Sequence, residues 1–389
     1  MLLNALACGP RDGAEGGVGR TADPEKLAAL ARHHRVVPVL FAKLREAGWK
    51  EEHLAPLRAE SRRNAARMLA LGAEWARLHR RFAAEGIRCL TLKGPALALL
   101  LYGDVTMRTC KDLDLLVAKR DFPRLQAVLR EEGYVRMKGE DEAWAVERAD
   151  EDEHHVEFVH PLRRMQVEAH WRINRGLERE PDFDELWMRG TPVEFGGAKG
   201  KMLGKEDLLP YLLVHGAEHG WFRLRWLLDI ARLTADDRSA GGTSPEEAAR
   251  RIAEYGCQNA AGQAAVLLSA LFAIPAPPEL APYARLRRAR ALARAALPLI
   301  GADRPAPELP AFIAYCLLLM PGGRRLRYVF FPNERDRGMI RLPRPLHALY
   351  FALRPLLWCL RAARRFVFGR LSHGAFGPDE GNEPSRLLG

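Results

Sequence analysis

Cysteine is scarce in this chain of 389 residues, and its six cysteines are scattered along the sequence. No two of them have the C-x-x-C spacing of redox motifs and zinc clusters, and no closely spaced framework is present. The cysteine content therefore argues against a disulfide-rich fold and against a cysteine-based zinc site. It indicates a reducing compartment.

Long apolar runs are also missing, and we see no internal repeat. The first eight residues are mostly apolar but lack the basic flank and the length of a signal peptide. The apolar stretch 346–360 is broken by Arg354 and Pro355, and it is shorter than the roughly 20 residues that span a bilayer. We expect a cytoplasmic protein, with the inner face of the membrane as an alternative location.

Lysine is absent from residues 321–371, where twelve arginines outweigh one glutamate and one aspartate to give a net charge of +10. The whole chain carries only +11, so its excess positive charge lies in this segment. Three interpretations remain open. The segment packs on the rest of the protein with its arginines reaching water, it contacts an anionic membrane surface, or it binds RNA or an acidic protein.

Helical patterns surround a central region of mixed character. Residues 24–32, 37–47 and 54–86 have the periodicity of helices, and strand-like runs appear only after them. The expected fold class is α+β, with a small mixed sheet embedded in a largely helical protein. The expected regions are an N-terminal helical region (1–83), a strand-containing core (84–200), a helical domain closing a cleft (201–300), a basic arginine-rich helical module (301–371) and a disordered tail (372–389).

The most informative motif is Asp-x-Asp at Asp112 and Asp114, within a run that reads as a strand. Alternate residues of a strand share a face, so both carboxylates point the same way. Neighbouring carboxylates repel each other unless a cation lies between them, and Mg²⁺ favours carboxylates together with phosphate oxygens. The motif therefore indicates a metal-nucleotide site, although a solvated strand edge gives the same pattern.

A second polar face is expected on a strand over 165–170, where Glu168 and His170 alternate with apolar residues. This strand would form a hairpin with 156–159, and His154 and His155 lie at the start of that partner. For each of these two histidines, one interpretation is a residue that lines the active cleft, and the alternative is an ordinary loop residue. An ion pair between Glu168 and Arg163 or Arg164 is the alternative to a metal-binding role.

The order of these segments resembles a family of uncharacterised bacterial nucleotidyltransferases within the polymerase-β-like superfamily. The resemblance is carried by the Lys93-Gly94 junction, by Arg108 followed by Asp-x-Asp, and by the segment from Gln166 to Trp171. It begins near residue 31 and continues through His215 to Asp229, so it covers most of the chain before about residue 235.

The resemblance implies a division of roles. Asp112 and Asp114 would hold two Mg²⁺ ions, or Mn²⁺ in their place, and Glu168 would be the third carboxylate. Gly94 would let the backbone approach the triphosphate at a helix N-terminus. Lys93 and Arg108 would pair with phosphates. The common Gly-Ser junction of the superfamily is Lys-Gly here, which leaves the role of Lys93 open.

The reaction implied by the resemblance is transfer of a nucleoside monophosphate from an NTP, such as ATP, to an acceptor, with release of pyrophosphate. The acceptor would be a small molecule, a peptide or protein, or RNA. A toxin-like enzyme that modifies RNA or protein is one alternative. A non-catalytic module that binds nucleotide or membrane is another.

A rival chemistry comes from His215-x-x-Glu218-His219, which matches the motif of inverted zinc peptidases. On a helix the two histidines would share a face and could bind zinc. The same segment also fits the nucleotidyltransferase pattern, in which His155, His170, His215, His219 and Asp229 are candidates for lining the cleft or binding the acceptor.

Overall fold

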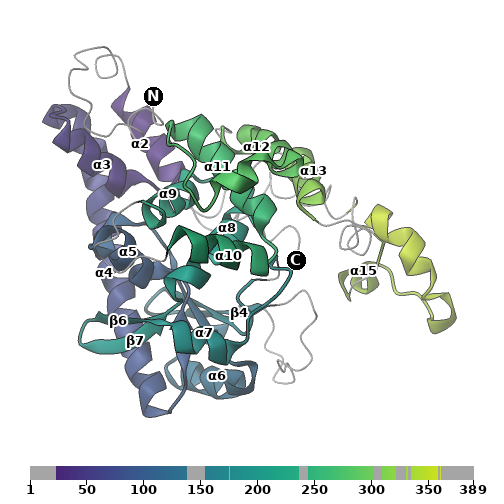
Figure 1. The fold of residues 1–389 in the computed structure, drawn as a ribbon. Coiled ribbons are helices and arrows are strands. Elements are labelled where there is room, and N and C mark those ends of the chain that lie inside the picture. The colour runs from purple at the N-terminus through teal and green to yellow at the C-terminus, as the bar shows by residue number, and fades with distance from the viewer. Residues whose placement is uncertain are drawn as a thin grey trace. The chain divides into compact units, whose positions relative to one another are not determined.

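The computed structural model describes residues 23–137, 154–174, 176–235, 244–301, 309–320, 330–331, 334–357 and 360. The fold class is α+β, as predicted, with helices around a seven-stranded mixed sheet (Figure 1). The chain forms two compact units. Unit 1 comprises Met1–Ala217 and Arg223–Ala293, and unit 2 comprises Glu218–Phe222 and Arg294–Gly389.

Three helices open unit 1 and confirm the helical N-terminal pattern. They are α2 (Pro24–His33), α3 (Val37–Glu46) and α4 (Glu51–Ala84). The Asp23 carboxylate caps α2 by accepting a hydrogen bond of 3.0 Å from the Glu25 backbone N–H. The 34-residue α4 buries Leu71, Trp75 and Phe82 in the core, so this helix supports the sheet along its length.

The sheet has the strand order β3-β4-β5-β2-β1-β7-β6. The strands are β1 (Cys89–Thr91), β2 (Asp112–Val117), β3 (Val135–Arg136), β4 (His155–His160), β5 (Met165–His170), β6 (Thr191–Phe195) and β7 (Ala198–Met202). β2 runs parallel to β5 and antiparallel to β1. The hairpin of β4 and β5 was predicted correctly.

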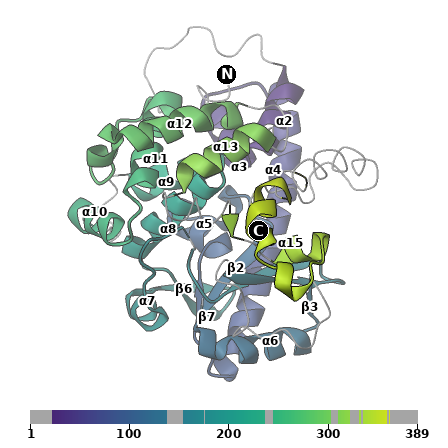
Figure 2. The ribbon, with the colours of Figure 1, turned by 90° about the vertical axis from the view of Figure 1, so that its right-hand side faces the viewer.

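The two faces of β2 and β5 differ in chemistry. Leu113 and Leu115 on β2, with Val167 and Ala169 on β5, are buried in the core that includes α4. The other face carries Asp112, Asp114, Gln166, Glu168 and His170, together with the buried Leu116. In both views α6 (Phe122–Glu131) lies beside one end of α4, and both helices contribute to this core (Figures 1 and 2). Because the apolar side chains of these strands are buried in the core, the alternating side chains must point to the opposite side of the sheet.

The hairpin of β6 and β7 was not identified from the sequence. Gly196 and Gly197 join its strands, and both have positive φ, 55° and 70°. A Gly-Gly pair between strand-like segments is typical of such turns, so the sequence did contain the signal. β7 pairs in parallel with β1 and extends the sheet on that side.

Unit 1 contains further helices. They are α5 (Gly94–Tyr102), α7 (Phe183–Arg189), α8 (Lys205–Glu218), α9 (Leu224–Leu233), α10 (Pro245–Glu254), α11 (Gln258–Phe272) and α12 (Arg287–Ile300). Of these, α8 and α12 end in residues of unit 2. Short 3-10 helices are η1 (Val105–Met107), η2 (Lys119–Asp121), η5 (Ala281–Arg285) and η6 (Arg344–Leu346), the last in unit 2.

Unit 2 also contains α13 (Leu309–Leu319) and α15 (Glu334–Met339). Arg354 Nη1 donates a buried hydrogen bond of 3.0 Å to Asp336 Oδ1 within this unit. Within the described ranges, no helix combines the length and the apolar content needed to cross a membrane. The predicted tail 372–389 and much of the arginine-rich segment lie outside the described residues.

Candidate functional site

The register of two neighbouring strands brings the predicted carboxylates together. β2 and β5 pair so that Asp114 lies opposite Glu168 and Asp112 lies opposite Gln166. Adjacent strands are about 4.8 Å apart, so side chains at paired positions on one face are direct neighbours. The three carboxylates, which come from segments more than 50 residues apart, therefore share one patch of the sheet.

Asp114 lies deepest in this patch, with only 2% of its side chain exposed. Its Oδ1 lies 3.0 Å from Lys93 Nζ, and the Lys93 side chain is itself 11% exposed. Burial alone would raise the pKa of Asp114, but the adjacent Lys93 charge outweighs burial and holds that pKa well below its usual range. The same attraction outweighs burial at Lys93 and raises the pKa of its amine. The pair is therefore ionised.

Glu168 has a different electrostatic environment from Asp114. Burial raises the pKa of Glu168 to about 7, and the charges of Asp112 and Asp114 act in the same direction, against an opposing effect of His170. A carboxyl group with this pKa exchanges protons near neutral pH, which suits a general base or a cation ligand.

His170 completes a group that could hold a metal ion. Its Nε2 lies 3.7 Å from Asp114 Oδ1 and 3.7 Å from Glu168 Oε2, beyond hydrogen-bond distance. Burial would lower the pKa of His170, but the two carboxylates outweigh burial and raise it. Ligand atoms of Asp114, Glu168 and His170 all lie within 4.8 Å of one another, which is compatible with a shared cation.

The helix after β1 begins beside these carboxylates. Gly94, its first residue, has φ of +73°, and a Cβ added there would lie 3.6 Å from the Asp112 carbonyl oxygen. Glycine is therefore favoured at position 94 because of the left-handed backbone conformation, and not because a Cβ would clash with its neighbours. No side chain of the described residues caps α5, so its first N–H groups are suited to bind an anion.

Helix α8 contributes two side chains around Lys93. His215 Nε2 lies 3.4 Å from Lys93 Nζ, and the centre of the Tyr211 ring lies 5.8 Å from the same nitrogen. His215 thus lies at the site, as expected for a cleft residue. Tyr211 was missed, because an aromatic residue in an apolar helix gives no local sign of a neighbouring lysine.

The two histidines of the H-x-x-E-H motif differ in secondary structure, and zinc binding by them stays a prediction. α8 ends at Glu218, so His219 follows the helix rather than lying on it. Neither His215 nor His219 belongs to a cluster of three metal-binding side chains in the described part of the chain. His215 instead approaches the Lys93 amine.

Arg108 and Asp229 form a buried pair of their own. Arg108 Nη2 donates a hydrogen bond of 2.9 Å to Asp229 Oδ2, and Arg108 Nε donates one of 3.1 Å to Oδ1. Their side chains are each 1% exposed. This pair ties the segment before β2 to α9 and uses Nε and Nη2 of Arg108, whereas its buried Nη1 has no hydrogen-bond partner within the described residues. Phosphate binding by Arg108 stays a prediction.

Glu157 is a further carboxylate that the sequence did not single out. It lies opposite Glu168 in the antiparallel pairing of β4 with β5. Ligand atoms of His155, Glu157 and Glu168 also lie within 4.8 Å of one another. The alternation of His155 and Glu157 at the predicted hairpin strand was the available signal.

Comparison with known proteins addresses the family of the chain. A family model described as an uncharacterised nucleotidyltransferase matches residues 20–273, well over half of the chain. Neither a curated protein nor a solved structure matches significantly. The matched segment includes β2, β5, the Lys93-Gly94 junction and α8. The chain therefore belongs to this family of uncharacterised nucleotidyltransferases.

Proposed function

We propose that this protein is a Mg²⁺-dependent nucleotidyltransferase that moves a nucleoside monophosphate from an NTP to an acceptor hydroxyl or phosphate and releases pyrophosphate. The observation that carries the proposal is the pairing of Asp114 with Glu168 across β2 and β5, with Asp112 on the same face. Family membership supports nucleotidyl transfer in general. The carboxylate patch supports its dependence on divalent cations.

The donor set fits magnesium. Asp112, Asp114 and Glu168 provide hard oxygen ligands, which Mg²⁺ prefers, and a bound triphosphate would supply further oxygens. Bound Mg²⁺ would neutralise charge on the triphosphate and orient the α-phosphorus. In the reaction an acceptor oxygen bonds to the α-phosphorus, and the bond from that phosphorus to the β-phosphate oxygen breaks.

The residues of the chain have distinct roles in this proposal. Glu168 takes the proton of the acceptor hydroxyl, or ligates the cation that lowers the pKa of that hydroxyl. Its pKa of about 7 suits either role. Gly94 and the first turn of α5 bind the triphosphate, because the N-terminus of a helix favours negative charge. Lys93, which contacts Asp114, would be able to pair with a phosphate if a cation bound Asp114 in its place.

The test combines pyrophosphate release with self-labelling. Purified protein is incubated with each α-labelled NTP and Mg²⁺, beside an Asp112→Asn/Asp114→Asn variant and a Glu194→Gln control, whose carboxylate is exposed on β6. Turnover or labelling that the double variant loses and the control keeps supports the proposal and identifies the preferred base.

Equilibrium binding distinguishes a missing acceptor from a missing activity. Binding of an NTP that depends on Mg²⁺ and on Asp112 and Asp114, without turnover, would favour the non-catalytic nucleotide-binding alternative or an absent acceptor. Adding RNA, peptide and small-molecule acceptors separates those two cases. The nucleotidyltransferase proposal fails if neither turnover nor Mg²⁺-dependent NTP binding is observed.

A further inference from the structure

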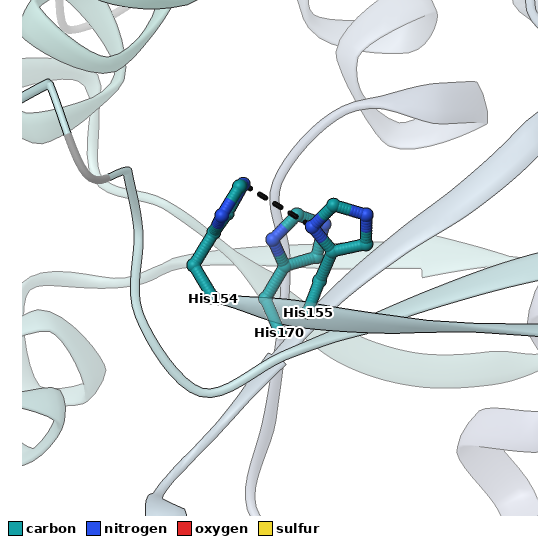
Figure 3. A group of neighbouring side chains, drawn as sticks. All are labelled: His154, His155 and His170. Carbon is teal, nitrogen blue, oxygen red and sulfur yellow. Dashed lines mark hydrogen bonds between the residues drawn. The ribbon is translucent and has the colours of Figure 1, made fainter. Parts of the chain in front are cut away.

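Figure 3 shows three histidines that gather where β4 begins and β5 ends. They lie beside the carboxylate patch. The antiparallel pairing places His155 opposite His170. His154 precedes β4, and its carbonyl accepts a hydrogen bond of 3.1 Å from the Trp171 backbone N–H, which holds it next to the end of β5. The sheet therefore positions all three backbones.

The ring nitrogens lie at distances that suit a metal. His155 Nδ1 and His154 Nε2 are 3.2 Å apart. Two nitrogens bound to one tetrahedral Zn²⁺ at about 2.0–2.1 Å would be about 3.3 Å apart. The centre of the His170 ring lies 4.9 Å from that of His155 and 5.6 Å from that of His154. One ligand atom from each residue lies within 4.8 Å of the others, which is compatible with one shared metal ion.

His170 provides an independent sign of a missing ligand. The residue is 4% exposed, and neither ring nitrogen has a hydrogen-bond partner within the described ranges. A buried imidazole without such partners loses the hydrogen bonds that water would give it, which costs free energy. A metal bound by one nitrogen would compensate for this loss. Stacking on His155 explains the position of the ring but leaves its nitrogens unsatisfied.

The chemistry of the donors selects the class of metal. Imidazole suits zinc, copper, iron and nickel ions, whereas Mg²⁺ prefers oxygen ligands. The histidine cluster and the carboxylate patch therefore differ in metal preference although they are adjacent. We propose that His154, His155 and His170 form a second metal site, which binds a zinc-like divalent cation next to the proposed magnesium site.

This second site would act on the first through His170. Its Nε2 faces Asp114 and Glu168 at 3.7 Å from each. A metal held by the other ring nitrogen would fix the orientation and tautomer of His170 against the two carboxylates. Glu157 or Glu168, which group with His155, is suitably placed for a fourth ligand. The inference stands without the proposed reaction, because metal binding is measured without NTP.

The experiment measures metal content and metal spectra on tag-free, full-length protein. The protein is stripped with EDTA, returned to buffer with excess Mg²⁺, and titrated with ZnCl₂ or CoCl₂. We expect one Zn²⁺ per chain by elemental analysis, and the visible absorption of tetrahedral Co²⁺. Excess Mg²⁺ competes for the carboxylates, and the histidine variants identify where Zn²⁺ binds.

Matched variants identify the ligands. His154→Asn and His155→Asn should each weaken Zn²⁺ binding at least tenfold. His33→Asn, in another adjacent histidine pair with ring centres 4.7 Å apart, should leave binding unchanged. Asp112→Asn should keep Zn²⁺ binding while impairing Mg²⁺-dependent NTP binding, which separates this inference from the proposed function.

Two results would overturn the second site. One is that the unmodified protein binds less than one Zn²⁺ per chain in excess Mg²⁺. This measurement needs no variant, so its result does not depend on how the substituted proteins fold. The other is Zn²⁺ affinity that His154→Asn and His155→Asn leave unchanged although circular dichroism shows both variants to be folded.

Discussion

At the scale of single residues, the contact between Lys93 and Asp114 is central to the site. It places a lysine where a divalent cation is proposed to bind, at 3.0 Å from a carboxylate with little access to water. The pair stabilises the negative patch when no metal is present, because a buried carboxylate without a counter-charge is strongly disfavoured. Lys93 and a divalent cation would therefore compete for the Asp114 carboxylate.

Replacing Lys93 by Met tests this competition. Without the ammonium group we expect the nucleotide-free protein to bind Mn²⁺ at least tenfold more tightly. In metal-free buffer the variant should lose about 3 kcal/mol of stability, because one partner of a buried pair is removed. Mn²⁺ titration by EPR and urea unfolding in EDTA measure the two effects. Lys111→Met removes a partly exposed lysine next to Asp112 and is the control. Equal Mn²⁺ affinities in wild type and Lys93→Met would contradict the competition.

His79 provides a prediction about pH. It stacks on Trp75 with ring centres 3.9 Å apart, and burial lowers the pKa of His79 to about 4 despite its hydrogen bond to the Trp75 carbonyl. In the unfolded chain a histidine titrates near 6.5, so the unfolded state takes up its proton at higher pH. The stability contributed by neutral His79 is complete above pH 6.5. It is lost as pH falls towards 4, by up to about 3 kcal/mol.

The measurement is the free energy of unfolding of wild type and His79→Gln from pH 8 to pH 4. The variant should lose less stability with falling pH than wild type, whatever its stability at pH 8. His53→Gln, at a partly exposed position on the same helix, should keep the wild-type slope. Parallel curves for wild type and His79→Gln would show that His79 is not responsible for the acid sensitivity.

At the scale of secondary-structure elements, α5 positions the triphosphate-binding end of the site. Its nine residues begin at Gly94 beside the Asp112 carbonyl and end before Gly103, which has φ of +68°. The helix is nearly all apolar and buries its first residues, so tertiary packing holds it more than helix propensity does. Its N-terminus is therefore fixed relative to β2.

Gly94→Ala should separate stability from function at this helix. An alanine Cβ fits the space, so the expected loss is about 1 kcal/mol from the left-handed backbone. The stiffer junction should also weaken Mg²⁺-NTP binding at least tenfold. Gly48→Ala has nearly the same φ of +74° with nothing near the added Cβ. It should show the same loss of stability with unchanged binding, as measured by urea unfolding and calorimetry. Equal binding in both variants would contradict a role for Gly94 in phosphate approach.

At the scale of the whole molecule, acidic and basic chemistry belong to different parts of the chain. The carboxylate patch lies in unit 1, whereas the arginine-rich segment belongs to unit 2. Eight large apolar side chains of unit 2 between residues 330 and 360 are 40–57% exposed. They are Phe330, Phe331, Ile340, Leu346, Leu349, Phe351, Leu356 and Leu360. Exposed arginines at 341 and 344 lie in the same stretch.

We propose that this part of unit 2 binds an anionic membrane surface, because exposed apolar side chains beside arginines suit the interface of an acidic bilayer. The full chain should sediment with phosphatidylcholine vesicles that contain phosphatidylserine, and less so at high salt. Phe331→Ser/Phe351→Ser should weaken binding at least fivefold. Leu69→Ser/Met188→Ser, which removes exposed apolar side chains of unit 1, should not.

Three results would contradict membrane binding by unit 2. These are equal sedimentation with neutral vesicles, equal binding by the two double variants, and RNA binding in place of vesicle binding.

The sequence by itself determined the local features. Alternation along residues 112–117 and 165–170 predicted which side chains face the core and which form the polar face, because the period of a strand is two. The ordered motifs predicted the family that the comparison confirms. The helices of the first 84 residues also followed from apolar periodicity.

Only the tertiary structure decided which distant residues meet. Arg108 and Asp229, 121 residues apart, could each have faced a ligand, but α9 packs so that they bond to each other. Lys93 could have remained at the surface, but the start of α5 directs it to Asp114. The grouping of His154 with His155 and His170 depends on the register of β4 against β5. Local periodicity carries no information about such contacts, because they depend on how segments far apart in the chain pack around one core.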